Sequence, residues 1–157
     1  MALEPGDEAP DFELRSHRGG SVRLSDFRGK NNVVLAFHPF AFTPVCATQM
    51  TNYESDQREL ADRDAVVLGI SIDPQPSKTA WAQTLGPISF DLLSDFYPHG
   101  EVAQKYGVLR QEGFSERAIF VVDKQGRIAW ARTYAIPEQP NNADCLSALE
   151  AVAARST

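Results

Sequence analysis

Cys46 is the residue in this chain whose chemistry most needs an explanation, because it stands where a helix is expected to begin. Thr43 and Pro44, just before it, are a good N-cap and a good first-turn proline. A cysteine in the first helical turn faces unpaired backbone N–H groups and the positive end of the helix dipole, and both favour thiolate over thiol. A reactive nucleophile is therefore one interpretation of Cys46. The other is a buried structural cysteine that acts as a small hydrophobic side chain.

Two neighbours of Cys46 bear on this choice. The hydroxyl of Thr43, three residues earlier, is expected to reach the sulfur or a substrate oxygen, or simply to cap the helix. Pro39 ends the preceding apolar run. It either shields the strand-to-helix junction before Cys46 from water or only terminates the strand. A junction between strand and helix in an α/β sheet is also the edge where ligands commonly bind.

Strands and helices alternate along the chain around this junction. Apolar or alternating runs predict strands at 11–14, 21–24, 32–37, 65–71, 90–93, 117–122 and 127–133. Apolar periodicity predicts helices at 44–62, 77–85, 99–106 and 143–154. The first two strands predict an N-terminal hairpin, and the turn at 123–126 predicts another near the end. The expected architecture is a layered α/β fold with a mixed central sheet flanked by helices.

Composition narrows the class of protein. The chain has 157 residues and a formal net charge of -6, which argues against a general nucleic-acid or anionic-membrane binder. The longest apolar runs have five residues, whereas a membrane span needs about 20. The acidic N-terminus lacks the pattern of a signal peptide, and two cysteines do not form a secreted disulfide framework. We expect one cytoplasmic domain over residues 1–157.

The segment 39–46 reads Pro-Phe-Ala-Phe-Thr-Pro-Val-Cys and resembles the P-x-x-x-T-x-x-C motif of the peroxiredoxins, the alkyl hydroperoxide reductase and thiol-specific antioxidant family. Further blocks resemble that family in the family's own order. They are Gly6 to Phe12, Leu24 to Lys30, Leu93 to Asp95, Tyr106 to Val108, and Arg117 to Ile128. The resemblance therefore extends through nearly the whole chain.

The resemblance implies a thioredoxin-like fold with an N-terminal β-hairpin extension. It also implies a thiol peroxidase for hydrogen peroxide and organic hydroperoxides, with peroxynitrite as a further candidate. Cys46 would be the peroxidatic nucleophile, Thr43 and Arg117 would bind and polarise the peroxide, and Pro39 would shield the pocket. No cofactor and no metal is expected. Gln49 stands where the family often has Glu, which changes a charge beside the site.

The implied reaction is consistent with general chemistry. A thiolate attacks one peroxide oxygen, and negative charge develops on the departing oxygen. The candidate donors to that oxygen are the Thr43 hydroxyl, the Arg117 guanidinium and the backbone N–H groups of Val45 and Cys46. The product is a sulfenic acid on Cys46, which a second thiol must reduce.

The source of that second thiol divides the family into subtypes. Some members carry a resolving cysteine five residues after the nucleophile, but this chain has Thr51 there. The segments 94–100 and 105–108 resemble the alkyl hydroperoxide reductase E group, whose members can use one cysteine and an external thiol. Thioredoxin, a glutaredoxin-like protein or a low-molecular-weight thiol would serve as the reductant. Cys145, at the expected start of the last helix, is the alternative resolving cysteine, since a thiolate would be mildly favoured there.

Other interpretations keep the same nucleophile. Cys46 could pass its oxidation to a partner protein as a redox sensor or relay. It could also act as a cysteine hydrolase with His38 or His99 as base, although no hydrolase signature surrounds it. Three aromatic residues are candidates for an apolar collar or for the contact of a homodimer, a common state in this family: Phe40, Phe42 and Tyr97.

Overall fold

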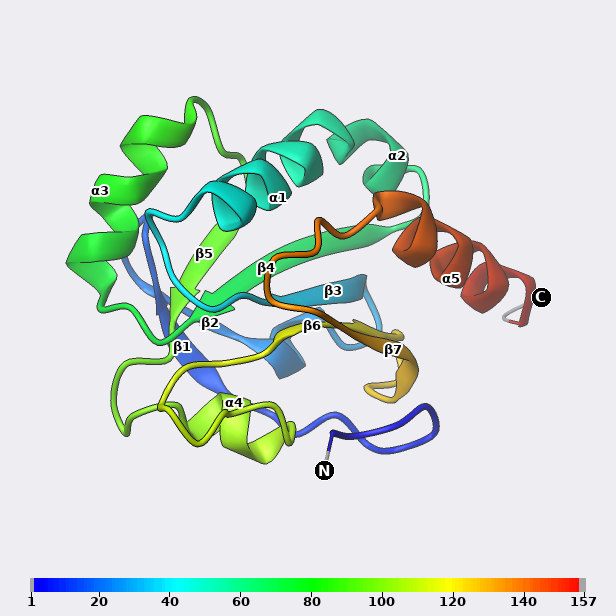
Figure 1. The fold of residues 1–157 in the computed structure, drawn as a ribbon. Helices are drawn as coiled ribbons and strands as arrows, with labels where there is room; N and C mark the ends of the chain where they lie inside the picture. Colours follow the sequence, from blue (N-terminus) through cyan, green and yellow to red (C-terminus); the bar gives the residue numbers. More distant parts are fainter. Residues whose placement is uncertain (1, 156–157) are drawn as a thin grey trace.

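A seven-stranded mixed sheet runs through residues 2–155, the part of the chain that this computed structural model describes (Figure 1). The strand order is β2-β1-β5-β4-β3-β6-β7. The strands are β1 (Glu13–Ser16), β2 (Ser21–Arg23), β3 (Asn32–Phe37), β4 (Ala65–Ser71), β5 (Asp91–Ser94), β6 (Arg117–Val122) and β7 (Ile128–Tyr134). The three central strands β3, β4 and β5 are parallel, and the other pairs are antiparallel.

Helices cover both faces of the sheet. They are η1 (Leu24–Phe27, a 3-10 helix), α1 (Pro44–Ser55), α2 (Gln57–Ala61), α3 (Gln75–Leu85), α4 (Glu101–Lys105) and α5 (Asn142–Arg155). Figure 1 shows α1, α3 and α5 on one face and α4 with the N-terminal segment on the other. Each face buries its own apolar cluster, so β3 and β6 are buried at every position. This explains why their sequences are continuous apolar runs rather than alternating ones.

The predicted α/β fold with a mixed sheet and an N-terminal hairpin is confirmed. The prediction of one continuous helix over 44–62 is wrong, because the chain breaks at Asp56 and continues as the short α2. The apolar periodicity misled here since Tyr53 and Leu60, on either side of the break, are both buried in the same cluster. Helix α3 also begins two residues before the predicted Ser77, with Pro76 inside its first turn.

Three strand ends meet at one edge of the sheet and position the site. Strand β3 ends at Phe37, and the loop 38–43 leads from it into α1. Strand β4 is parallel to β3, so Ser71 ends at the same edge. Strand β6 is antiparallel to β3, with Ala118 opposite Phe37, and its first residue, Arg117, therefore arrives beside the start of α1. None of the helices within residues 2–155 is long and apolar enough to cross a membrane.

Candidate active site

Cys46 lies in the first turn of α1 and is fully buried, with 0% of its surface exposed. Pro44 opens the helix and has no N–H to satisfy. The N–H groups of Val45 and Cys46 lie too early in the helix to bond a carbonyl one turn back. Cys46 therefore occupies the predicted position, where backbone donors and the helix dipole both favour an anion.

The partner of the Cys46 sulfur is a guanidinium. Arg117 Nη1 lies 3.3 Å from Cys46 Sγ and donates a hydrogen bond to it. Arg117 is itself 2% exposed, and its Nε donates to the carbonyl of Ile136 at 2.9 Å. A buried arginine held at a second point presents a fixed positive charge, which stabilises an anionic sulfur more than a solvated arginine would.

Gln49 continues this network away from the sulfur. Its Oε1 accepts a hydrogen bond from Arg117 Nη1 at 2.9 Å, and its Nε2 donates to the Tyr53 hydroxyl at 3.3 Å. Burial raises the pKa of Tyr53 far above its usual range, so this hydroxyl stays neutral. The amide therefore orients the guanidinium without neutralising it, in contrast to the charged Glu that the family often carries here.

Thr43 and Pro39 frame the entry to α1. Thr43 occupies the N-cap position, but its side chain makes no capping bond, so that expectation is wrong. Its Oγ1 instead donates to the carbonyl of Phe40 at 2.8 Å. Phe42 turns the chain with a φ of 63°, a left-handed conformation that costs a non-glycine residue free energy. Pro39 is buried between the end of β3 and this turn.

A buried polar cluster lies behind the loop 38–43, and the sequence prediction missed it. Lys78 Nζ contacts His38 Nε2 and Ser71 Oγ, each at 2.8 Å. Ser71 donates onward to Asp73, which also accepts the N–H of Ala41. One signal was present in the sequence: Lys78 is three residues before Trp81, on the face of α3 that packs into the core.

The structure does not bring a histidine to the sulfur as a base. His38 is fully buried, stacks on Trp81 at 5.3 Å between ring centroids, and uses Nε2 for Lys78. Burial, followed by the charges of Lys78 and Arg117, holds the pKa of His38 well below its ordinary value. His99 lies near the surface and bonds the carbonyl of Gly113. This arrangement does not support the hydrolase interpretation, which needs an imidazole beside Cys46.

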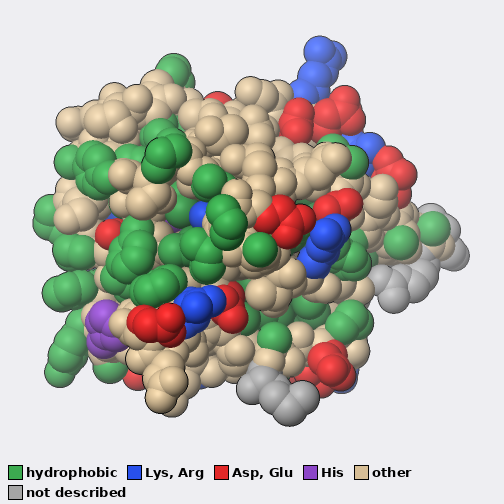
Figure 2. All heavy atoms as spheres, in the orientation of Figure 1, with side chains coloured by type: hydrophobic (Ala, Val, Ile, Leu, Met, Phe, Trp, Pro, Cys, Tyr) green, Lys and Arg blue, Asp and Glu red, His purple; other side chains and the backbone are tan. Residues whose placement is uncertain are grey.

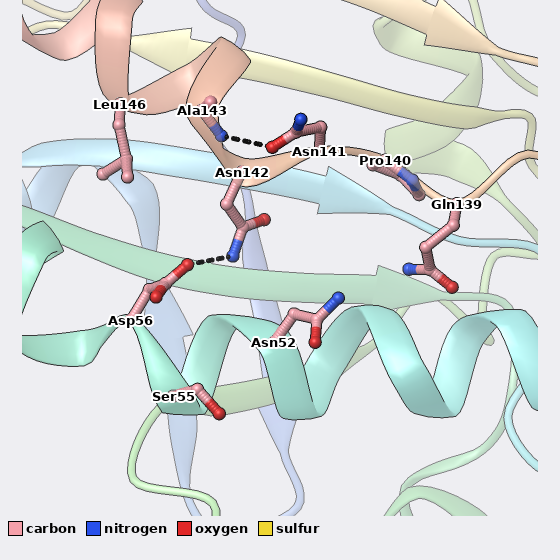
Figure 3. Close-up of a pocket in the computed structure, with 9 residues that line it drawn as sticks. All are labelled: Asn52, Ser55, Asp56, Gln139, Pro140, Asn141, Asn142, Ala143 and Leu146. Atoms are coloured by element: carbon pink, nitrogen blue, oxygen red, sulfur yellow. Dashed lines mark hydrogen bonds between the residues drawn. The ribbon is translucent and has the colours of Figure 1, made fainter.

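Cys145 sits in the first turn of α5 and is 1% exposed, contrary to the expectation of a favoured thiolate. Burial is the main reason that the pKa of its thiol rises to about 12, and it outweighs the dipole of the helix. Its Sγ lies 3.3 Å from the carbonyl oxygen of Asn142. A hollow of about 570 Å³ lies at this helix start. Residues from the end of α1, Asp56 and the segment 139–146 line it (Figure 3). Its lining includes neither Cys46 nor Arg117, Gln49 or Thr43.

A cysteine sulfur beside a fixed guanidinium and free backbone donors can, as a thiolate, attack an electrophile whose leaving atom becomes anionic. A peroxide is such an electrophile, and the arrangement defines a thiol peroxidase of the thioredoxin-like class. The AhpC/TSA family model matches residues 5–131. Alkyl hydroperoxide reductase E of Mycobacterium tuberculosis is 42% identical over 130 residues, which cover 82% of this chain and 84% of the relative.

Two more relatives extend the comparison over nearly the whole chain. The chloroplastic 2-cysteine peroxiredoxin of Chattonella marina var. antiqua is 34% identical and covers 97% of this chain and 82% of its own length. The crystal structure of reduced Plasmodium vivax 2-Cys peroxiredoxin superposes with a TM-score of 0.91 at 26% identity, covering 98% of this chain and 84% of that one. The chain belongs to the AhpC/TSA family of peroxiredoxins, and it is a thiol-dependent peroxidase.

Proposed function

We propose that Cys46 is the peroxidatic nucleophile and that Arg117, Thr43 and Pro39 complete its site. The observation that carries this assignment is the 3.3 Å contact between Arg117 Nη1 and Cys46 Sγ, made between two buried groups. The substrates are hydrogen peroxide and organic hydroperoxides, with peroxynitrite as a further candidate. The relatives whose names include alkyl hydroperoxide reductase support the organic hydroperoxides.

The reaction breaks the O–O bond of the peroxide. The Cys46 thiolate attacks one oxygen, a sulfur–oxygen bond forms, and the other oxygen leaves as an alkoxide or hydroxide that takes a proton from water. Arg117 and the N–H groups of Val45 and Cys46 stabilise the departing oxygen, and one such donor accounts for about 10²–10³ in rate. The sulfur is oxidised to sulfenic acid, and the peroxide is reduced to an alcohol or to water.

Thr43 orients the peroxide rather than the leaving group. A hydroxyl has one proton, and that of Thr43 is already given to the carbonyl of Phe40. Its free lone pairs are therefore available to accept the O–H of a hydroperoxide, which aims the attacked oxygen at the sulfur. This role differs from the donor role expected from the sequence.

Recycling uses an external thiol. Cys145 is buried, and its pKa of about 12 keeps the thiol neutral, whereas attack on a sulfenic acid needs a thiolate. A resolving role for Cys145 would require α5 to unpack from the core. Thioredoxin, a glutaredoxin-like protein or a low-molecular-weight thiol is the proposed reductant. A cycle that consumes thiols fits a reducing compartment such as the cytoplasm.

The active protein is a homodimer in this proposal. Large apolar side chains are exposed in the loop before α1 and after β5: Phe40 at 37%, Phe42 at 59%, Phe96 at 51% and Tyr97 at 86%. Figure 2 shows hydrophobic side chains gathered on the side of the molecule where the loop before α1 lies. Large apolar side chains exposed in this way are typical of a contact between proteins. Replacement of Phe42 and Tyr97 by serine should convert the dimer to monomer in sedimentation velocity.

Peroxide turnover tests the whole assignment. The reduced protein should consume hydroperoxide continuously when a thiol reductant is supplied, and Cys46→Ser should consume none. Cys145→Ser should turn over as the original protein does. One stoichiometric oxidation without turnover, with any of the three reductant classes, would instead support the sensor or relay alternative. Turnover by Cys46→Ser would overturn the proposal.

A further inference from the structure

Lys78 is a charged residue that the proposed mechanism leaves without a task. It lies on α3, is 0% exposed, and points its ammonium group into the layer between α3 and the sheet. A buried lysine is expensive for a protein unless its charge is paired or used. No carboxylate is bonded to Lys78 Nζ directly among the interactions of residues 2–155. Its partners are the neutral groups His38 and Ser71, each at 2.8 Å.

The proton arrangement around Lys78 is determined by its partners. His38 is neutral, and in the tautomer that carries its proton on Nδ1 its Nε2 accepts a hydrogen bond from the Lys78 ammonium. Ser71 donates its own proton to Asp73 Oδ2 at 2.6 Å, so its oxygen accepts the second one. The ring of Trp81 lies 5.6 Å from Nζ and adds a cation–π contact. The contacts with Ser71 and Trp81 favour the ammonium form, and the contact with His38 favours it in the tautomer that carries its proton on Nδ1.

A chain of hydrogen bonds connects Lys78 to the loop that precedes Cys46. Asp73 Oδ2 also accepts the N–H of Ala41 at 2.8 Å, which connects Lys78 through Ser71 and Asp73 to the loop before Thr43. Lys78 Nζ lies over the ring of Trp81, which is buried in the same apolar cluster as Cys46, and the negative charge of a Cys46 thiolate acts to raise the pKa of Lys78. The charge state of Lys78 is therefore connected to the loop by hydrogen bonds and to the Cys46 sulfur by electrostatics.

We propose that Lys78 is a second cation of the peroxidatic site, a positioning residue that favours the Cys46 thiolate from the side of α3. The inference rests on the proposed role of Cys46 as the nucleophile. The interaction between two titrating groups is reciprocal. The thiolate favours the ammonium form of Lys78, and the ammonium favours the thiolate form of Cys46 by the same free energy.

Opposing effects of burial and of nearby negative charges set the pKa of Lys78 close to neutral pH. Burial lowers its pKa to about 7, although the negative charges of Asp73 and Cys46 act in the opposite direction. Below that pH the ammonium stabilises the thiolate, and above it the support is lost. The charged and titratable groups around Lys78 come from five segments: His17 after β1, His38 after β3, Cys46 on α1, Asp73 after β4, and Arg117 on β6, which acts on His38.

Lys78→Met tests the proposal, because methionine is unbranched, is only one atom shorter than lysine, and carries no charge. The pH at which half of Cys46 is alkylated by iodoacetamide should rise by about one unit. The rate of Cys46 oxidation by hydrogen peroxide should fall about tenfold at pH 6 and approach that of the original protein at pH 9. Lys105→Met, which removes a surface lysine paired with Glu101, is the matched control and should change neither.

A purely structural Lys78 would behave differently. Lys78→Met would then lower the rate by the same factor at every pH and leave the half-alkylation pH unchanged, and that result would overturn the proposal. Absence of peroxide turnover in the original protein would contradict the proposed function instead, while leaving the alkylation shift measurable. The two failures are thereby distinguished.

A second measurement needs no change at Lys78, in case the methionine variant does not fold. NMR of protein labelled with ¹³C-lysine should show Lys78 titrating near neutral pH, with Lys30, Lys105 and Lys124 as reference signals. In Cys46→Ser the midpoint of Lys78 should fall by about one unit, because the thiolate is gone. An unchanged midpoint would show that the lysine and the sulfur are not coupled.

Discussion

Replacement of Arg117 by methionine removes the guanidinium beside Cys46 while keeping a long side chain in the same space. At the observed 3.3 Å, two unit charges attract by about 5 kcal/mol with an effective dielectric constant near 20. Desolvation of both groups offsets part of this attraction. The closer comparison is the loss of one oxyanion donor, which costs about 2.7–4 kcal/mol. We therefore expect Arg117→Met to oxidise about 10²–10³ times more slowly.

Stopped-flow fluorescence measures this rate. Trp81 is buried and stacks on His38, so its emission should report changes around the site. The second-order constant is taken from the observed rate against hydrogen peroxide concentration. Arg127→Met is the matched control, because Arg127 lies near the surface and donates to the carbonyl of Gly6. It should oxidise at the original rate.

Folding of Arg117→Met must be verified first. Methionine leaves two acceptors without their donor, the Ile136 carbonyl and Gln49 Oε1, at about 1–3 kcal/mol each. That cost is within the usual 5–15 kcal/mol of stability, so the variant should be folded at 25 °C and melt at a lower temperature. A folded Arg117→Met that oxidises within about threefold of the original protein, a difference under 1 kcal/mol, would refute the reasoning.

Three further predictions follow from the same contacts. Gln49→Glu places a carboxylate on Arg117 and should raise the half-alkylation pH of Cys46 by up to about one unit, as measured by mass spectrometry; a fall would contradict this. Thr43→Val should slow oxidation by about tenfold or more, measured in stopped flow, since it loses the acceptor for the peroxide proton; an unchanged rate would remove Thr43 from the site. The free energy of unfolding, measured in urea titrations, should fall between pH 8 and pH 10 by about 2 kcal/mol less in Cys145→Ala than in the original protein. The unfolded state can ionise Cys145 above its ordinary pKa while the folded state holds the thiol neutral up to about 12, so stability falls as pH rises; parallel curves would contradict the burial of Cys145.

The central strands were predictable with their bounds because a strand that is buried on both faces must be apolar at every position. The runs at 32–37, 65–71 and 117–122 coincide with β3, β4 and β6. The end of α1 was not predictable in this way. Tyr53 and Leu60 keep the same apolar face across the break at Asp56, so periodicity alone reads one helix where the chain forms two.

The candidate site was predictable where local sequence carries it and not where packing does. The position of Cys46 in a first helical turn follows from its neighbours in the chain. Its contact with Arg117 spans 71 positions and was expected only through the resemblance to a family. The approach of Lys78 to His38 depends on how α3 packs on the sheet. The burial of Cys145 likewise depends on α5, and neither was anticipated.

Chemical trapping of a sulfenic acid tests most directly whether Cys46 is the sulfur that peroxide oxidises. The reduced protein is mixed with one equivalent of hydroperoxide in the presence of dimedone, which reacts with sulfenic acids, and its peptides are analysed by mass spectrometry. The label should appear on the peptide that contains Cys46 as rapidly as peroxide disappears, and Cys145 should stay unlabelled. A label on Cys145, or consumption of peroxide with no label on Cys46, would contradict the mechanism.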